Sequence, residues 1–227
     1  GSIVISGDIY ATDQLTVPGL IMPATNPDIF VIESTYGGKQ HASRALEEAR
    51  LIERIGQIVA KKGSVLIPAF AVGRSQELIL LVSRAIEQGK LPKIPVFVDG
   101  MVKSVCGVYS SYPHLMASWL KHRIKSKGNP FFYQGGPAVP IYDPKTRKEA
   151  AKVRPAVIIS SSGMVTVGSP SSFYATEFAA DPSCLIAIWE AAGPTARICS
   201  IAVADSVFGF PCSSRTSWPF VSVTDLS

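Results

Sequence analysis

The 227-residue sequence has no run of 18 apolar residues, few cysteines and few histidines, and each shortage excludes a class of protein. Without a long apolar run we expect no membrane-spanning helix, and no basic stretch followed by an apolar one opens the chain as a secretory signal does. The four cysteines never occur as Cys-x-x-Cys, so a zinc finger is not supported. Unpaired, reduced thiols in a cytoplasmic protein are the expectation.

The three histidines, His41, His114 and His122, show neither His-x-His nor His-Glu-x-x-His spacing. We therefore predict no metal cluster built from them. His41 follows Glu33 by eight residues and is interpreted as a surface imidazole, whereas His114 and His122 are expected on one solvated amphipathic helix. Gly-x-Gly-x-x-Gly and the phosphate-loop lysine are also missing, which disfavours a plain Rossmann-like nucleotide binder.

Positive charge is missing from the first 38 residues, which hold four acids and no Lys or Arg. Residues 39–154 carry 20 Lys and Arg against 8 Asp and Glu, and residues 155–227 carry 2 against 5. A basic middle beside an acidic rim suits a polyanion that meets a cation-binding edge. The alternative is a solvated helical surface with lysine-rich loops, and charge alone favours it.

Short β-branched runs alternate with amphipathic stretches along most of the chain. The pattern predicts strands at 3–5, 29–32, 65–67, 96–98, 156–159 and 185–188, the first two of them buried. It predicts helices at 43–62, 74–88, 101–111, 114–125 and 171–180, with Ser43 as the N-cap of the first. Continuous apolar strands alternating with helices indicate an α/β fold with a parallel sheet covered on both faces.

Two segments break this pattern. Residues 126–149 are rich in Gly, Pro and Lys and are interpreted as a loop excursion on the substrate side. Within it, residues 131–133 (FFY) either stack on bases or fix the loop onto the core. From about residue 190 the periodicity fades, and the last 30 residues do not continue the same domain.

Polar groups follow the strands at their carboxyl ends, where ligands gather in open α/β sheets. Asp8, Glu33 and Asp99 each come after a predicted strand, and residues 160–164 (SSSGM) follow another. Carboxylates that converge on one crevice can hold a cation or move a proton. The alternative is that each acid simply caps a helix.

Two further features allow two interpretations. Ser161, Ser162 and Gly163 offer hydroxyl and backbone N–H groups to a substrate phosphate, or they merely link a strand to a helix with a permissive glycine. Arg74 opens a helix and either meets a phosphate or pairs with Glu77 one turn later. Both alternatives stay open on the sequence alone.

Several strings resemble the β-CASP branch of the metallo-β-lactamase superfamily. They are SGD at 6–8, DIFVIESTYG at 28–37, PAFAVGRSQEL at 68–78, FVDGM at 97–101, YP at 112–113 and SSGM at 161–164. The resemblance covers roughly residues 3–188, and the ESTYG and PAFAVGR-QEL strings in this order are highly specific. Its fold is α/β, a Rossmann-like parallel-sheet β-CASP domain attached to a metallo-β-lactamase domain, and its members include RNA-processing nucleases.

The resemblance implies a zinc-dependent phosphodiester hydrolase that acts on RNA. Asp8 aligns with the family's aspartate that bridges two zinc ions. Glu33 aligns with the acid of the first β-CASP motif, which orients a metal-ligand imidazole and supports proton transfer. In the family a zinc-activated hydroxide attacks the phosphodiester in line. We therefore expect Asp8 as a metal ligand, Glu33 as a catalytic residue and Ser161, Ser162 and Gly163 as substrate contacts.

The sequence also departs from the family pattern. The family's His-x-His-x-Asp-His string lies upstream of the bridging aspartate, yet only seven residues precede Asp8, and no histidine follows His122 where two β-CASP histidines belong. One ligand does not make a two-zinc site, since each zinc takes about four ligands. The chain is thus expected to be the middle of such an enzyme, and a non-catalytic RNA-binding module is the alternative function.

These observations divide the chain into three parts. Residues 1–35 are predicted to be a remnant of the metallo-β-lactamase domain, residues 36–189 the β-CASP domain, and residues 190–227 an atypical tail. RNA is the expected partner, together with the missing half of the metallo-β-lactamase domain or a second copy of the chain. No membrane partner is expected.

Overall fold

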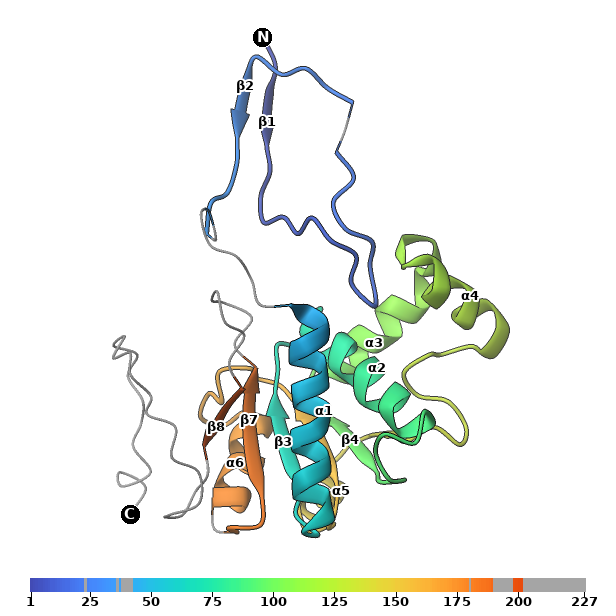
Figure 1. Cartoon of the computed structure of the whole chain (residues 1–227), viewed down its shortest axis with the longest axis vertical. Coiled ribbons are helices and arrows are strands. Elements are labelled where there is room, and N and C mark those ends of the chain that lie inside the picture. Colours follow the sequence, from blue (N-terminus) through green and yellow to red (C-terminus); the bar gives the residue numbers. More distant parts are fainter. Residues whose placement is uncertain (23, 36, 38–42, 180, 190–197, 202–227) are drawn as a thin grey trace.

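A computed structural model describes residues 1–22, 24–35, 37, 43–179, 181–189 and 198–201. It confirms the predicted α/β fold: a six-stranded sheet lies at the centre, in the order β5-β4-β6-β3-β7-β8, and five of its strands are parallel (Figure 1). The strands are β3 (Val65–Pro68), β4 (Val96–Asp99), β5 (Ala138–Pro140), β6 (Val157–Ser160), β7 (Leu185–Trp189) and β8 (Ile198–Ile201).

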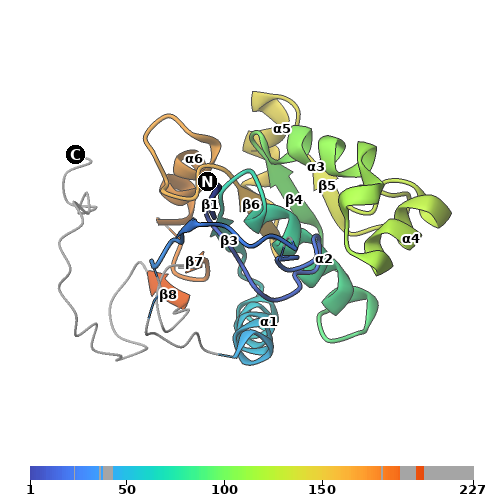
Figure 2. The ribbon, with the colours of Figure 1, turned by 90° about the horizontal axis from the view of Figure 1, so that it is seen from above.

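Helices cover both faces of this sheet. They are α1 (Arg44–Ala60), α2 (Arg74–Glu87), α3 (Val102–Ser111), α4 (Ser118–Lys127), α5 (Pro144–Ala150) and α6 (Pro170–Ala179), with a 3-10 turn, η1 (Pro113–Leu115). Seen from above, α1 and α2 lie on one side of the sheet and α6 on the other (Figure 2). The predicted helices at 43–62, 74–88, 101–111 and 171–180 are confirmed within two residues at either end.

The alternation of side chains along the strands divides the core in two. On β3, Val65 and Ile67 pack with residues of α1 and α2. Leu66, which lies between them, packs on the other face with Ile158 of β6 and Tyr174 of α6. Each of these side chains is at most 1% exposed, and burying one aliphatic side chain contributes about 1.5–3 kcal/mol. The continuous apolar strands therefore hold the sheet between two layers.

Residues 126–149, expected as a loop excursion, contain regular structure. β5 forms an edge of the sheet beside β4, and α5 begins with Asp143 as its N-cap, whose carboxylate accepts from the N–H of Thr146 at 2.9 Å. Phe131 is fully buried and packs edge-on against Tyr109. The packing interpretation of the aromatic string is thus correct for Phe131.

One expectation about the helices is wrong, and another is confirmed in position only. His114 and His122 do not share a helix, because the predicted helix at 114–125 is divided into η1 and α4. Ser43 occupies the N-cap position of α1, but its side chain makes no capping hydrogen bond. The antiparallel edge strand β8 was not predicted, and the remaining residues of the predicted tail lie outside the described residues.

The first part of the chain forms a separate two-stranded parallel sheet from β1 (Ile3–Ile5) and β2 (Ile29–Val31). Both strands occur where predicted, but the expectation that they are buried is wrong. Ile3, Ile5 and Ile29 are 62%, 71% and 53% exposed. A parallel pair is normally covered on both faces, and in Figure 1 this one stands apart from the six-stranded sheet.

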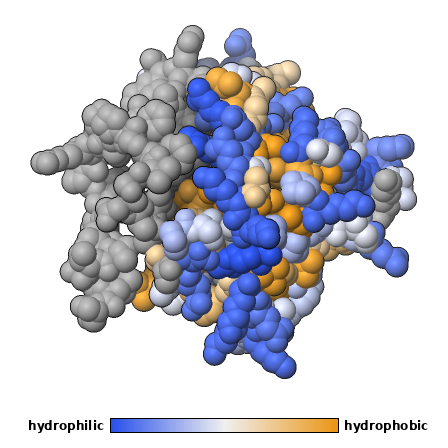
Figure 3. All heavy atoms as spheres, turned by 60° about the horizontal axis from the view of Figure 1, so that its bottom comes forward, coloured by the Kyte–Doolittle hydropathy of each residue, from blue (hydrophilic) through white to orange (hydrophobic). Residues whose placement is uncertain are grey.

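The described surface is mixed in character on the face that Figure 3 shows. In the view that brings the lower end of the molecule forward, hydrophilic and hydrophobic residues alternate across the described part (Figure 3). None of the described helices is long and apolar enough to cross a membrane.

Candidate functional site

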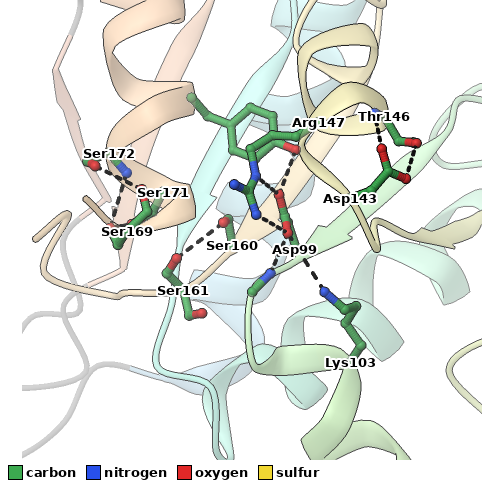
Figure 4. A network of polar contacts seen from close by, with 12 residues as sticks. Asp99, Lys103, Asp143, Thr146, Arg147, Ser160, Ser161, Ser169, Ser171 and Ser172 are labelled. Atoms are coloured by element: carbon green, nitrogen blue, oxygen red, sulfur yellow. Dashed lines mark hydrogen bonds and ion pairs between the residues drawn. The ribbon is translucent and has the colours of Figure 1, made fainter. Parts of the chain in front are cut away.

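A buried carboxylate lies at the carboxyl end of β4. Asp99 is fully buried and accepts hydrogen bonds from Arg147 Nε at 2.6 Å, Arg147 Nη2 at 3.1 Å and Tyr174 Oη at 3.0 Å (Figure 4). The N–H of Gly100 adds a fourth at 2.6 Å, and Lys103 Nζ lies 3.9 Å away. Arg147 and Asp99 therefore form a bidentate ion pair, in which two parallel N–H groups of the guanidinium bond to the two carboxylate oxygens.

The charges around Asp99 are balanced within the protein. Hydrogen bonding to Asp99 raises the pKa of Arg147, and burial together with the negative charge of Asp99 raises the pKa of Tyr174. Arg147 is therefore charged and Tyr174 is a neutral donor throughout the ordinary pH range. The lone pairs of Asp99 are taken up by these donors, which makes the residue a structural centre of this edge.

The Ser-rich turn after β6 packs directly against this centre. Met101 N donates to Ser161 Oγ at 3.2 Å, and Ser171 donates to both carbonyls of the turn, from its N to Ser161 O at 3.0 Å and from its Oγ to Ser162 O at 2.6 Å. Thr166 N donates to Ser162 Oγ at 3.2 Å. Ser161 and Ser162 are only half-buried. The turn is thus fixed by these hydrogen bonds and carries its hydroxyl groups near the surface.

Two glycines allow this packing. A Cβ on Gly100, whose φ is +79°, would lie 2.1 Å from Ser161 Oγ, and a Cβ on Gly163 would lie 2.9 Å from Phe70 N. Both distances are too short for real contacts. The turn after β6 therefore lies close to the end of β4 at Gly100 and close to the segment after β3 at Phe70, because the two glycines lack side chains.

Asp8 and Glu33 both follow the strands of the small sheet at its carboxyl end. β1 and β2 run in register, with Ile5 opposite Val31, and Glu33 N donates to Ser6 Oγ at 3.0 Å. Asp8 is exposed and Glu33 half-buried. Thr35 N donates to Glu33 Oε2 at 2.9 Å, and this bond with that of the Thr35 side chain lowers the pKa of Glu33. Glu33 is thus a carboxylate near neutral pH.

The acids of the two sheets do not converge on one crevice, contrary to the expectation that joined Asp8, Glu33 and Asp99. Asp99 is enclosed in the six-stranded sheet, whereas the other two lie on the two-stranded sheet. Within the part of the chain that the structure describes, no three His, Cys, Asp or Glu residues form a group that could hold a metal ion. His41 lies outside that part. The described residues therefore do not fit a zinc site by themselves.

Sequence reasoning missed a second buried carboxylate, Glu77 of α2. Its two oxygens accept from Leu15 N at 2.9 Å, Thr16 N at 2.7 Å and Thr16 Oγ1 at 2.5 Å, and Arg44 Nη2 also donates to it. Thr16 O in turn accepts from Ala117 N at 2.8 Å, just before α4. These contacts fasten the N-terminal segment to α2 and α4. Local spacing carried no signal for them because the partners are 61 and 62 residues apart.

The surroundings of Glu77 bear on whether Arg74 contacts a phosphate or pairs with Glu77. A small pocket is lined by two arginines, two glutamates and two leucines, namely Arg44, Glu48, Arg74, Glu77, Leu78 and Leu81. Burial and the nearby charge of Arg44 lower the pKa of Arg74, while Glu77 opposes that shift. The two guanidinium and two carboxylate charges cancel, which makes this pocket a poor site for a phosphate.

The comparisons with known proteins agree with this architecture. The family model described as the Beta-Casp domain matches residues 75–196, more than half of the chain. The chain belongs to the β-CASP family. The match takes in Asp99, the turn at Ser161–Gly163 and the strands on either side of them.

Individual β-CASP relatives extend the likeness beyond that range. The chain is 35% identical over 176 residues to transcription termination factor FttA of Pyrococcus horikoshii, covering 75% of this chain and 26% of the relative. It is 32% identical over 206 residues to FttA of Thermococcus kodakarensis, covering 86% and 31%. An RNase J-like protein of Methanocaldococcus jannaschii is 32% identical over 170 residues, covering 73% and 38%. The β-CASP chain therefore spans a quarter to two fifths of the length of these relatives.

Proposed function

We propose that the chain acts on RNA as part of a β-CASP phosphodiester hydrolase. The observation that carries the proposal is the family match together with relatives that bear the names transcription termination factor and RNase J-like protein. The net charge of +12 over residues 39–154 supports a polyanionic substrate. The half-buried Ser161–Gly163 turn is the proposed contact with the RNA backbone. A cytoplasmic location is part of the same proposal.

The proposed metal chemistry assigns limited parts to two residues, Asp8 and Glu33. Asp8 is exposed and would supply one carboxylate ligand to zinc, with the remaining ligands coming from residues other than those described. Glu33, held by Ser6 and Thr35 at the same end of the sheet, would orient a neighbouring ligand and carry a proton. Zinc thus stays a proposal that rests on the family resemblance.

The exposed sheet of β1 and β2 favours a partner for this half of the site. A parallel strand pair whose isoleucines are more than half exposed requires cover on both faces. We propose the rest of a metallo-β-lactamase domain as that cover. A second copy of this chain is the competing occupant, and light scattering on the purified chain between 5 and 200 micromolar would reveal it as a dimer.

A second candidate function is a non-catalytic module that binds RNA while another part or protein cleaves it. The observation that favours it is the missing metal group among the described residues. It shares the Ser161–Gly163 contact and the basic middle with the first candidate. The two differ in whether this chain, supplied with zinc, breaks a phosphodiester bond.

One experiment separates these functions. An end-labelled single-stranded RNA is incubated with the purified chain and zinc, beside the Asp8→Ala variant and a control, Glu53→Ala, at an exposed position on α1. Cleavage lost only in Asp8→Ala supports the hydrolase. Binding without cleavage by any of the three supports the module. A chain that neither binds nor cleaves RNA contradicts both.

A further inference from the structure

Acidic residues are missing from a long stretch between Asp99 and Asp143. Residues 100–142 contain no Asp or Glu but five cationic residues: Lys103, Lys121, Arg123, Lys125 and Lys127. This stretch forms α3, η1, α4 and β5. Figures 1 and 2 both place α4 at the opposite side of the molecule from β8. The positive charge on that side is thus not diluted by acids of the same segment.

The side chains of α4 are divided between core and solvent. Leu120 is fully buried and Ile124 packs against the larger core cluster. Trp119, His122 and Lys125 are exposed, and their spacing of three residues aligns them along one face. At 1.5 Å per residue this stripe extends about 9 Å. An aromatic ring, an imidazole and an ammonium group therefore face solvent in a row.

The cations of α4 differ in their partners. Arg123 is engaged by Glu87 at 3.0 Å and lies over the ring of Tyr133. Lys121 and Lys125, in contrast, make no ion pair with any acid in the described parts of the chain. These two lysine side chains are thus available to an external anion.

Trp119 has the properties of a stacking platform. Its side chain is 37% exposed, although tryptophan is usually well buried. The guanidinium of Arg84 lies 4.9 Å from the centre of the indole ring and fixes it by a cation–π contact. A fixed, partly exposed indole beside free ammonium groups fits a ligand with both flat rings and negative charge.

We propose that the face of α4 formed by Trp119, Lys121, His122 and Lys125, called here the α4 face, binds single-stranded RNA. A base stacks on Trp119, and phosphates flanking it contact Lys121 and Lys125. This inference rests on the proposed action on RNA and adds a binding surface separate from the Ser161–Gly163 turn. An acidic protein would satisfy the lysines but leave the indole unused.

The position of the α4 face suits an RNA that continues towards the N-terminal segment. Ala117, which precedes α4, is hydrogen-bonded to Thr16, and eight residues separate Thr16 from Asp8. Eight residues span at most about 29 Å when fully extended. A strand bound on α4 therefore lies within a few nucleotides of the segment that carries Asp8.

The test measures the affinity of the whole chain for a fluorescein-labelled 20-nucleotide oligo(U) by anisotropy over a series of salt concentrations. The Lys121→Glu/Lys125→Glu variant is compared with Lys61→Glu/Lys93→Glu, which makes the same charge change at exposed lysines just before β3 and β4. We expect the α4 variant to bind at least about tenfold more weakly. The slope of log affinity against log salt should fall by about 1.4, as expected for two lost phosphate contacts on a single strand.

Trp119→Leu tests the stacking part independently. We expect it to weaken oligo(U) binding by on the order of tenfold while leaving binding to heparin, a polyanion without bases, unchanged. Circular dichroism melting confirms that each variant is folded. Protection of Lys121 and Lys125 from acetylation by bound RNA, measured by mass spectrometry, gives the same information without any substitution.

The outcomes separate this inference from the proposed function. If the parent chain binds RNA and the two double variants weaken binding equally, or if RNA leaves Lys121 and Lys125 unprotected, the α4 face is refuted and action on RNA stands. If the parent chain binds poly(Glu) as tightly as oligo(U), an acidic protein replaces RNA as the partner. If the parent chain binds no RNA, both proposals are refuted together.

Discussion

Thr16 and Glu77 are joined by two hydrogen bonds across 61 residues: both the backbone N–H and the hydroxyl of Thr16 donate to the same carboxylate oxygen. Thr16 is fully buried and the Glu77 side chain is only 5% exposed. Arg44 also donates to Glu77, so this buried side chain accepts from a guanidinium as well as from Thr16. Together with the bond from Ala117 N to Thr16 O, the bonds of Glu77 attach the N-terminal segment to the six-stranded body.

Replacing Glu77 by Gln tests this attachment. The amide would turn an NH2 group towards donors, which leaves N–H groups unpaired and removes one of the two carboxylate partners of Arg44, the other being Glu48. We expect the free energy of unfolding to fall by about 3 kcal/mol, measured by urea denaturation. The segment before α1 should also be cut sooner in limited proteolysis. The control Glu53→Gln, on the exposed face of α1, should change stability by less than about 0.5 kcal/mol, and equal losses in both variants would contradict the assignment.

Substitutions of Asp99 and of its partner Tyr174 should lower the stability of the fold by different amounts. Asp99→Asn removes the buried charge that faces Arg147 and should lower stability by about 3 kcal/mol. Tyr174→Phe removes one donor and leaves the ion pair, so the loss should be about 1 kcal/mol. Chemical denaturation gives both values. A Tyr174→Phe loss as large as that of Asp99→Asn would mean that packing, and not the ion pair, holds this edge.

The two sheets should respond differently to the same truncation. Ile158→Ala leaves a cavity between β6 and α6, and should lower the free energy of unfolding by about 3–4 kcal/mol. Ile3→Ala, at a 62% exposed position on β1, should change it by less than about 0.5 kcal/mol. Thermal or urea unfolding measures the difference. A large loss for Ile3→Ala would show that β1 is covered in solution.

The thiol of Cys106 should be unreactive in the folded chain. Burial raises its pKa to about 12, although the hydrogen bond with Gln76 acts in the other direction. At pH 8 the thiolate is therefore scarce, and a maleimide should label Cys106 only after unfolding in urea. Peptide mass spectrometry distinguishes this residue from the other cysteines. Rapid labelling without urea would contradict the buried position of the Cys106 side chain on α3.

Asp181 predicts a loss of stability in acid. Hydrogen bonds from Ser183, led by its hydroxyl, lower the pKa of Asp181 from 3.8 to about 2. Because the folded pKa lies below the unfolded one, the stabilisation is complete above about pH 4 and disappears as the pH falls through 2. Asp181→Asn should flatten the stability profile in that window. Measurements at pH 7 and pH 2.5 on both proteins test the sign.

The sequence predicted what depends on local periodicity and missed what depends on long-range partners. Apolar runs such as 65–67 identified the inner strands because side chains there are buried on both faces. The same kind of run at 3–5 is largely exposed. An apolar run predicts a strand that is stable when covered, but it does not show whether this chain supplies the cover. β5 escaped prediction because Gly and Pro surround a strand of three residues.

The candidate site was predictable to a similar degree. The position of Asp99 at a strand end followed from the pattern, but its neutralisation by Arg147 depends on a residue 48 positions later. Glu77 looked like an ordinary helix residue until the fold placed Thr16 against it. Roles for Asp8, Glu33 and the Ser161–Gly163 turn stay predictions for the experiments above.

The close approach of Gly100 to Ser161 has a consequence for how this protein can evolve. Any side chain at position 100 meets the hydroxyl of residue 161 and also has to adopt a φ of +79°, which L-residues rarely do. Smaller residues at 161 relieve only the first of these two restrictions. Position 100 should therefore be nearly invariant as glycine in functional homologues, and a serine at position 161 is compatible only with that glycine.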